Sequence, residues 1–136
     1  MKMTEGKICL IAAGIVLNEQ KNKILLIKRA DLMWGDVWSI PGGHIEYGET
    51  VDEALKRELK EELNLEISDT KFLCYEEFSV PTKRNKYFIS LNFIVLAKER
   101  IVPNEEIKEA GWFDVSKLSE INHKVPKEGI EYIDGL

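Results

Sequence analysis

Apolar residues along the chain fall into short runs separated by polar segments, and this pattern predicts strands. The runs Ile8–Leu17 and Ile24–Ile27 flank the polar segment Asn18–Lys23, which is typical of two strands joined by a hairpin. Later runs rich in β-branched and aromatic residues predict three more strands, at Lys71–Val80, Tyr87–Ala97 and Gly111–Asp114. The chain is therefore expected to contain a sheet.

The segment Thr50–Leu63 has a different period and predicts a helix. Its apolar residues recur every four positions and form one stripe, made of Val51, Leu55, Leu59 and Leu63. Thr50 and Glu53 have the spacing of a capping box, which satisfies backbone donors in the first turn. Asn64 follows the last helical residue and tolerates the left-handed conformation that ends many helices.

The remaining segments predict short elements. Trp38–Ile40 is expected to be extended, Pro41-Gly42-Gly43 to form a turn, and Val115–Leu118 and Glu128–Ile133 to form short helices. Several strands, few helices and no regular alternation favour an α/β (α+β) fold in which helices pack on a mixed sheet. No repeat, low-complexity tract or linker interrupts the chain, so residues 1–136 are expected to form one domain.

Composition and charge narrow the classes of function. The 136 residues are 44% hydrophobic and 32% charged, as is ordinary for a globular protein. A formal net charge of −5 disfavours a nucleic-acid partner, and the longest apolar run, Ile8–Leu17, is too short to cross a membrane. Cys9 and Cys74 have no metal-binding spacing, and the chain shows no export signal, so we expect a cytoplasmic protein with two buried free thiols.

Three acids on the predicted helix are candidates for chemistry. Glu58, Glu61 and Glu62 stand at i, i+3 and i+4, so their carboxylates project together beside the apolar stripe. They also lie near the negative end of the helix, which costs roughly 0.3–1 kcal/mol each before their mutual repulsion is added. Hard divalent cations relieve such a cluster, because Mg²⁺ prefers carboxylate and water oxygens. The alternative is a solvated acidic face offset by Lys56 and Lys60.

The glycines before this helix are a second candidate. Gly42 and Gly43 allow the backbone to approach a ligand or metal closely, but taken alone they are better explained by a plain tight turn.

Together, these glycines and the acidic helix resemble the signature of the Nudix hydrolase family. That signature reads Gly, five residues, Glu, seven residues, Arg-Glu, an aliphatic residue, any residue, Glu-Glu, any residue, Gly and an aliphatic residue. The matching residues here are Gly43, Glu49, Arg57, Glu58, Leu59, Glu61, Glu62 and Leu65. Asn64 stands where the family usually has Gly, and because Asn also adopts the left-handed conformation, little loss of function is expected.

The resemblance implies an α/β/α sandwich around a mixed sheet. It also implies a hydrolase that cleaves a phosphoanhydride bond with Mg²⁺, for which Mn²⁺ can substitute. The implied metal ligands, one of which accepts the proton of the attacking water, are Glu58, Glu61 and Glu62. Arg57 is implied to hold a carboxylate in position, Glu49 to buttress the loop, and the Gly42 carbonyl to add a further ligand.

Further contacts are expected outside the helix. The candidate substrate-binding residues are Arg29, Trp34, Gly43, His44 and Arg84. Trp34 could instead pack on the core, and Arg84 could instead lie in a solvated loop without contacting the substrate. Glu106 is expected to bring an additional acid to the metal, with Glu105 and Glu109 as competitors and a solvated acidic loop as the alternative.

The expected substrate is a small nucleoside diphosphate-linked compound such as ADP-ribose or another nucleotide sugar. Pro81, 16 residues beyond Leu65, is similar to a proline in family members that cleave ADP-ribose. A nucleoside triphosphate pyrophosphohydrolase that releases pyrophosphate is one alternative, and a non-catalytic nucleotide-binding module is another. A monomer and a homodimer are both compatible with the sequence.

Overall fold

The computed structural model describes residues 6–31, 35–80 and 85–136. The predictions for Trp34, Arg84 and Pro81 lie outside these residues. None of the described helices is long and apolar enough to cross a membrane.

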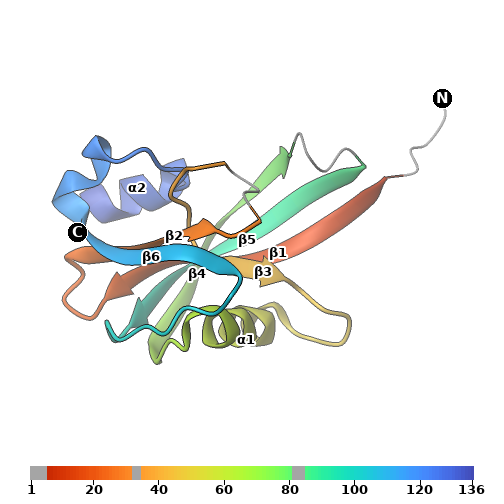
Figure 1. Cartoon of the computed structure of the whole chain (residues 1–136), viewed down its shortest axis with the longest axis horizontal. Coiled ribbons are helices and arrows are strands. Elements are labelled where there is room, and N and C mark those ends of the chain that lie inside the picture. The colour runs from red at the N-terminus through yellow and green to blue at the C-terminus, as the bar shows by residue number, and fades with distance from the viewer. Residues whose placement is uncertain (1–5, 32–34, 81–84) are drawn as a thin grey trace.

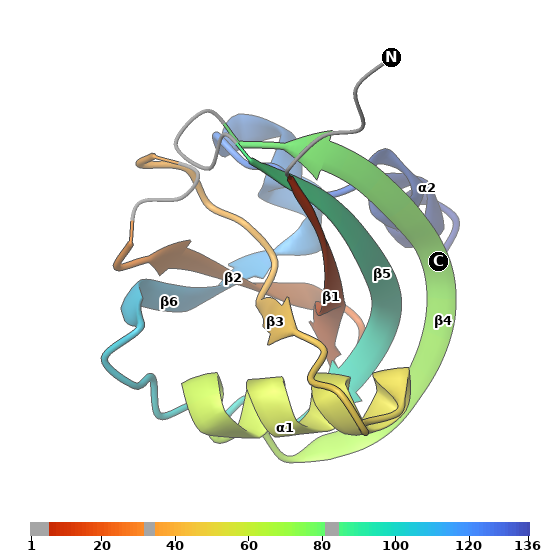
Figure 2. The same cartoon turned by 90° about the vertical axis from the view of Figure 1, so that its right-hand side faces the viewer.

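A six-stranded mixed sheet forms the middle layer (Figures 1 and 2). Its strands are β1 (Lys7–Asn18), β2 (Lys23–Arg29), β3 (Gly42–His44), β4 (Ile67–Ser79), β5 (Lys86–Ala97) and β6 (Ile107–Asp114). They follow the order β4-β5-β1-β2-β6, and β3 pairs with β1 beside this path. The β1–β5 pair is parallel and the other pairs are antiparallel. The predicted hairpin is confirmed, because Val16 of β1 lies opposite Leu25 of β2.

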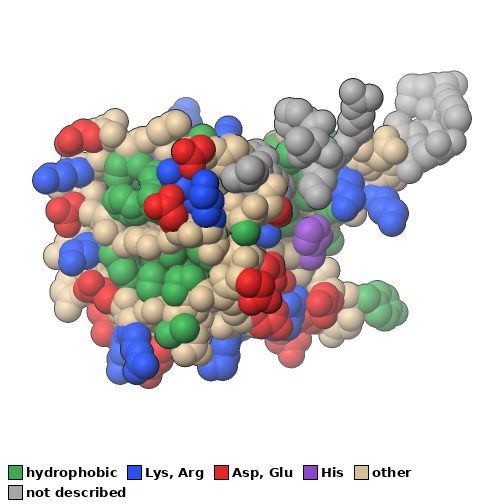
Figure 3. Space-filling model, viewed as in Figure 1, with side chains coloured by type: hydrophobic (Ala, Val, Ile, Leu, Met, Phe, Trp, Pro, Cys, Tyr) green, Lys and Arg blue, Asp and Glu red, His purple; other side chains and the backbone are tan. Residues whose placement is uncertain are grey.

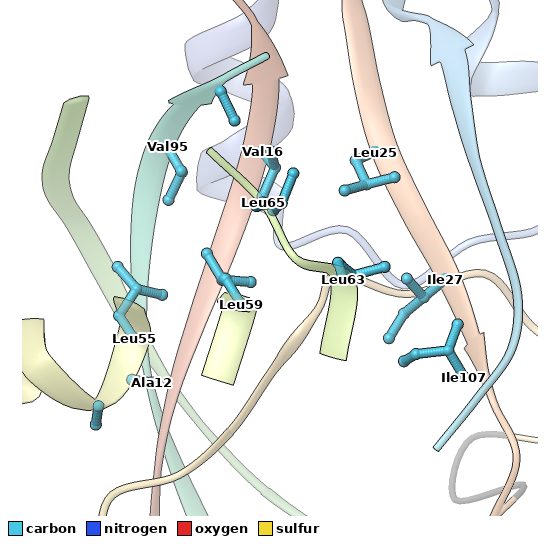
Figure 4. Close-up of a cluster of buried hydrophobic side chains, with 12 residues drawn as sticks. Ala12, Val16, Leu25, Ile27, Leu55, Leu59, Leu63, Leu65, Val95 and Ile107 are labelled. Carbon is cyan, nitrogen blue, oxygen red and sulfur yellow. The ribbon is translucent and has the colours of Figure 1, made fainter. Parts of the chain in front are cut away.

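Helices cover the two faces of this sheet. Helix α1 (Val51–Leu63) lies against one face, while the 3-10 helix η1 (Val115–Glu120) and helix α2 (Lys127–Asp134) lie against the other (Figure 1). On the α1 side, Leu55, Leu59 and Leu63 pack against a cluster that includes Val16 and Val95, as Figure 4 shows. On the α2 side, Ile133 joins the buried cluster around Ile15, Leu17 and Ile94. The predicted sandwich around a mixed sheet is confirmed.

Helix α1 has the ends that its sequence predicts. The Thr50 side chain accepts a hydrogen bond from the Glu53 backbone at 3.1 Å, and the Glu53 carboxylate accepts one from the Thr50 backbone at 2.8 Å. Asn64 closes the helix in the left-handed conformation with φ of 52°. Both caps are local and fix where the helix begins and ends. The packed stripe of Leu55, Leu59 and Leu63 fixes its rotation and therefore the direction of its acidic side chains.

The predicted turn at Pro41-Gly42-Gly43 is wrong, because Gly42 and Gly43 belong to strand β3. A side chain on Gly42 would collide with the Ala12 carbonyl of β1, so this glycine permits close strand packing instead of a chain reversal. Two strands also begin earlier than expected, β4 at Ile67 and β6 at Ile107. Each added segment begins with an isoleucine, Ile67 or the buried Ile107, but polar residues separate it from the next apolar run, so the apolar pattern alone does not include it.

The two cysteines and Trp38 are each only partly buried. Cys9 and Cys74 are unpaired as expected, but both are half-buried instead of fully buried. Trp38 is partly buried and packs edge-on against Phe113 with ring centres 4.8 Å apart.

Candidate active site

Helix α1 presents its three candidate acids to very different surroundings. The side chain of Glu62 is 1% exposed, that of Glu58 is 14% exposed and that of Glu61 is 55% exposed. The difference follows from the helix phase, since Glu62 is adjacent to the buried Leu63 and one turn from Glu58. Acidic side chains gather on the surface over α1 and beside β3 (Figure 3).

Arg57 ties this helix to the loop that precedes it. Its guanidinium donates to both oxygens of Glu49, at 2.6 and 2.9 Å, and to the His44 carbonyl at 2.9 Å. It also donates to Glu58 at 2.9 Å and to Glu61 at 3.2 Å. The hydrogen bond to Glu49 is the largest cause of the raised pKa of Arg57. One guanidinium therefore sets the positions of three carboxylates.

Glu49 also holds the loop that precedes the helix. Its carboxylate accepts the backbone N–H of Glu46 at 2.8 Å while it receives the Arg57 fork. The bond from Arg57, followed by that from Glu46, lowers the pKa of Glu49. Glu49 thus joins Arg57 of the helix to the backbone of the preceding loop.

Gly43 lies directly against the Glu58 carboxylate. A Cβ atom at Gly43 would overlap the carboxylate carbon and both of its oxygens, so only glycine fits while Glu58 keeps this position. The sequence suggested that the backbone approaches a ligand here, and the structure shows that it approaches a carboxylate.

Glu62 is a buried acid, and one of its carboxylate oxygens accepts no hydrogen bond from the described residues. Its Oε2 faces the Arg29 Nη1 at 3.3 Å, while its Oε1 is buried and has no hydrogen-bond partner among the described residues. Burial is the main cause that raises the pKa of Glu62 to about 8, and Arg29 opposes this rise. An unpaired buried oxygen is costly unless a ligand reaches it. Arg29 also bonds Asp31, with Nε and Oδ1 3.3 Å apart.

Glu106 lies near the same cluster, at the start of β6. Its charge contributes to raising the pKa of both Glu58 and Glu62, although burial is the larger cause for each. Its carbonyl accepts the Ala30 backbone N–H at 2.9 Å, which joins this loop to the end of β2. Glu109 is directed elsewhere, because its carboxylate faces Lys28 at 3.6 Å.

The donor set suits a hard divalent cation. Within the described residues, no three acidic, histidine or cysteine side chains already surround a common point. The carboxylates of this cluster nevertheless offer only oxygen atoms, which are the ligands that hard cations prefer. The buried Oε1 of Glu62 has no hydrogen-bond partner among the described residues, so it can serve as such a ligand. Gly42 is buried in β3 opposite Ala13, and its carbonyl stays a predicted ligand.

A pocket of about 400 Å³ adjoins the acids on the other side of β3. Arg29, Gly43 and His44, three of the candidate substrate contacts, line its near end. Residues that the sequence did not single out line the rest, among them Ser39, Glu76, Phe78, Ser90, Lys124 and Lys127. The sequence carries no local signal for them, because Glu76, Phe78 and Ser90 come together only through the pairing of β4, β5 and β1. The other three come from segments outside these strands.

The arrangement has its counterpart among known proteins. The family model for the NUDIX domain matches residues 10–133, which include every described element except the start of β1 and the end of α2. The chain belongs to the Nudix family. Arg57 joins three of the residues that match the family signature, Glu49, Glu58 and Glu61. The chain is a hydrolase of the pyrophosphohydrolase class that this family comprises.

Relatives of this Nudix chain act on different nucleotides. The ADP-ribose pyrophosphatase of Methanocaldococcus jannaschii is 35% identical over 126 residues, which cover 90% of this chain and 73% of that protein. An 8-oxo-dGTP diphosphatase of Haemophilus influenzae is 34% identical over 87 residues, 64% of each chain. The MutT Nudix hydrolase structure from Burkholderia pseudomallei superposes with a TM-score of 0.70 at 21% identity, covering 94% of this chain and 97% of that one, and so shows the shared fold.

Proposed function

We propose that this Nudix hydrolase cleaves the pyrophosphate linkage of a nucleoside diphosphate-linked compound, ADP-ribose or another nucleotide sugar, with Mg²⁺ as its ion. The observation that carries the proposal is the set of carboxylates around Arg57, which adjoins a pocket large enough for part of a nucleotide. The similarity to the ADP-ribose pyrophosphatase of Methanocaldococcus jannaschii favours ADP-ribose over other nucleotide sugars.

The chain's own residues have separate tasks in this reaction. Glu58, Glu61 and Glu62 would hold the ion, with Glu106 and the Gly42 carbonyl as additional ligands. The bound ion supplies charge neutralisation for the diphosphate oxygens and lowers the pKa of the attacking water. One of the helix carboxylates accepts the proton of that water, while Arg57 and Glu49 keep the helix and its loop in register.

Arg29 and His44 bind the substrate. Arg29 lies between Glu62 and the pocket, so its guanidinium can meet a phosphate that is bound at the carboxylates. His44 is exposed at the pocket wall, next to Gly43. We also keep the predicted contacts from Trp34 and Arg84 as part of the proposal.

A nucleoside triphosphate pyrophosphohydrolase is the second candidate. The similarity to the Haemophilus influenzae 8-oxo-dGTP diphosphatase favours it. The same acids serve both reactions, because in-line attack on a phosphoanhydride depends mainly on positioning and charge neutralisation. At the phosphates, the two classes of substrate differ in the group attached to the second phosphate, which is a sugar in one and a third phosphate in the other.

A product screen tests both candidates. The protein is incubated with nucleotide sugars and nucleoside triphosphates, with Mg²⁺ or with chelator, and the products are separated by chromatography. Cleavage of ADP-ribose gives AMP and ribose 5-phosphate, whereas the second candidate gives a nucleoside monophosphate and pyrophosphate. We expect turnover with Mg²⁺ or Mn²⁺ only, since the proposed site is all oxygen. Full turnover in chelator, or none on any compound with Mg²⁺, would overturn the proposal.

A further inference from the structure

One row of residues across four strands runs from the near end of the pocket to its far end. His44 of β3 lies opposite Ile11 of β1, Ile11 lies opposite Ser90 of β5, and Ser90 lies opposite Glu76 of β4. All four line the same pocket. Adjacent strands are about 4.8 Å apart, so three steps place Glu76 roughly 14 Å from the strand that bears His44. This span is sufficient for a phosphate and the sugar or nucleoside attached to it.

Glu76 is held at this position by a buried polar network. Asn92, which is fully buried, donates from Nδ2 to the Glu76 Oε1 at 3.0 Å. Ser90 donates from its hydroxyl to the Asn92 Oδ1 at 2.7 Å, which fixes the orientation of the amide. Among the described residues, none donates a hydrogen bond to the second carboxylate oxygen of Glu76. The network therefore presents a pre-oriented acceptor to the pocket.

The charges at the two ends of the pocket orient a ligand. Arg29 lies at the end next to the α1 acids, whereas the carboxylate of Glu76 lies at the other end. A carboxylate accepts hydrogen bonds and repels phosphate. The wall between the ends includes the side chains of Ile11, Phe78 and Val125. Lys86, Lys124 and Lys127 also line the pocket, so positive charge is not confined to the Arg29 end. At Glu76 itself, the carboxylate favours a part of the ligand that carries hydrogen-bond donors over one that carries phosphate.

We propose that Glu76 determines specificity by accepting hydrogen bonds from two adjacent donors at the uncharged end of the substrate. The cis-diol of a ribose presents two such O–H groups, and the edge of guanine presents N1–H and the 2-amino group. An adenine edge places an acceptor beside its amino group, and a uracil edge flanks its single N–H with carbonyls, so both leave acceptors facing the carboxylate. This inference rests on the proposed function for the location of the phosphates.

Binding of two matched ligand pairs in chelator tests the proposal without turnover. GMP and AMP differ in the base edge, and ribose 5-phosphate and 2-deoxyribose 5-phosphate differ in the diol. We expect titration calorimetry to show at least about a tenfold preference for the paired donor within one of the two pairs, and that pair identifies the source. Glu76→Gln keeps an acceptor for Asn92 but replaces the free oxygen by a donor, so this preference should fall to less than about twofold.

Glu77→Gln is the matched control. Glu77 is the next residue of β4, is exposed on the opposite face and accepts a hydrogen bond from Tyr87. This variant should keep the full preference. Equal binding within both pairs, or a preference that survives Glu76→Gln, overturns the role of Glu76. Both results are independent of the product screen, so a protein that binds selectively but hydrolyses nothing would contradict the proposed function alone.

Discussion

At the scale of single residues, burial separates acids that the sequence places together. Glu58, Glu61 and Glu62 share one helix face, yet the fold buries Glu62, partly covers Glu58 and leaves Glu61 exposed. An isolated charge loses most in a buried position, so the acid that is least favourable for the fold is also the best ligand for a cation.

Replacing these acids by Gln should separate chemistry from folding. We expect Glu58→Gln and Glu62→Gln to lower turnover with Mg²⁺ by a factor on the order of 10²–10⁴. Glu61→Gln should cost less, because its side chain is more than half exposed. Rates at saturating Mg²⁺ check the series, and Lys60→Gln, an exposed change on the same helix, serves as the control. Normal turnover in the Glu58 and Glu62 variants would make these acids structural.

The stability of the metal-free protein should depend on the protonation of Glu62. Its pKa rises from 4.5 to about 8 on folding, so the folded state holds a proton that the unfolded state releases. The resulting stabilisation is complete below pH 4.5 and is lost as the pH rises through 8. Glu62→Gln removes this dependence. We therefore expect the free energy of unfolding of the variant, relative to the parent, to increase by at least about 1 kcal/mol between pH 5 and pH 8.

Urea unfolding in chelator at both pH values measures this difference. Because the two proteins share every other titrating group, their difference isolates Glu62. A constant difference across the range would mean that Glu62 is ionised in the folded protein at all these pH values.

At the scale of elements, α1 is predictable and β3 is not, for one physical reason. The ends of α1 are specified by local contacts among Thr50, Glu53 and Asn64, so the sequence predicts the helix almost to the residue. Strand β3 exists because Gly42 and Gly43 fit closely between β1 and α1, a contact between distant segments. The same limit applies to Glu76, which reaches the pocket only through the register of β4 on β5.

The helix C-terminus tolerates the departure from the family signature. Asn64→Gly should leave turnover nearly unchanged and shift the free energy of unfolding by less than about 1 kcal/mol, because both residues adopt the left-handed conformation. Thermal melts and steady-state rates measure the two effects. A tenfold fall in turnover would reveal a role of the Asn64 side chain beyond the cap.

The contact between β3 and α1 should be intolerant of a single methyl group. Gly43→Ala forces the Glu58 carboxylate to move, so we expect turnover to fall by a factor on the order of 10². Gly111→Ala is the matched control, because a Cβ atom there would meet Phe113 at an ordinary 3.5 Å. If the rates of both variants equal that of the parent, Glu58 does not need its observed position.

At the scale of the whole molecule, the sheet separates two tasks. Its α1 side carries the acids, the α2 side carries the pocket, and the short strand β3 lies between them. The layer order could be predicted from the sequence, whereas the pocket could not, because its walls come from five strands, the residues before β3 and the segment that leads into α2.

Binding of the proposed ion should stabilise this whole arrangement. A ligand that binds only the folded state stabilises it by about 2.7 kcal/mol at a hundred times its dissociation constant. We expect Mg²⁺ to raise the melting temperature of the parent and to raise that of Glu62→Gln much less. Calorimetric melts with and without chelator check this expectation, and equal shifts in both proteins would place the ion elsewhere.

The bond from Arg57 to Glu49 has a consequence for how this chain can change in length. The two residues are connected through the first two turns of α1, and each added helical residue rotates the later part of the helix by about 100°. One inserted residue between them would turn Arg57 and every later acid away from the loop, whereas an insertion in the exposed hairpin at Glu19–Lys21 would only lengthen a turn. The number of residues between Glu49 and Arg57 therefore sets the direction in which the later side chains leave the helix axis. Descendants of this sequence can vary in length at the hairpin but not within these turns.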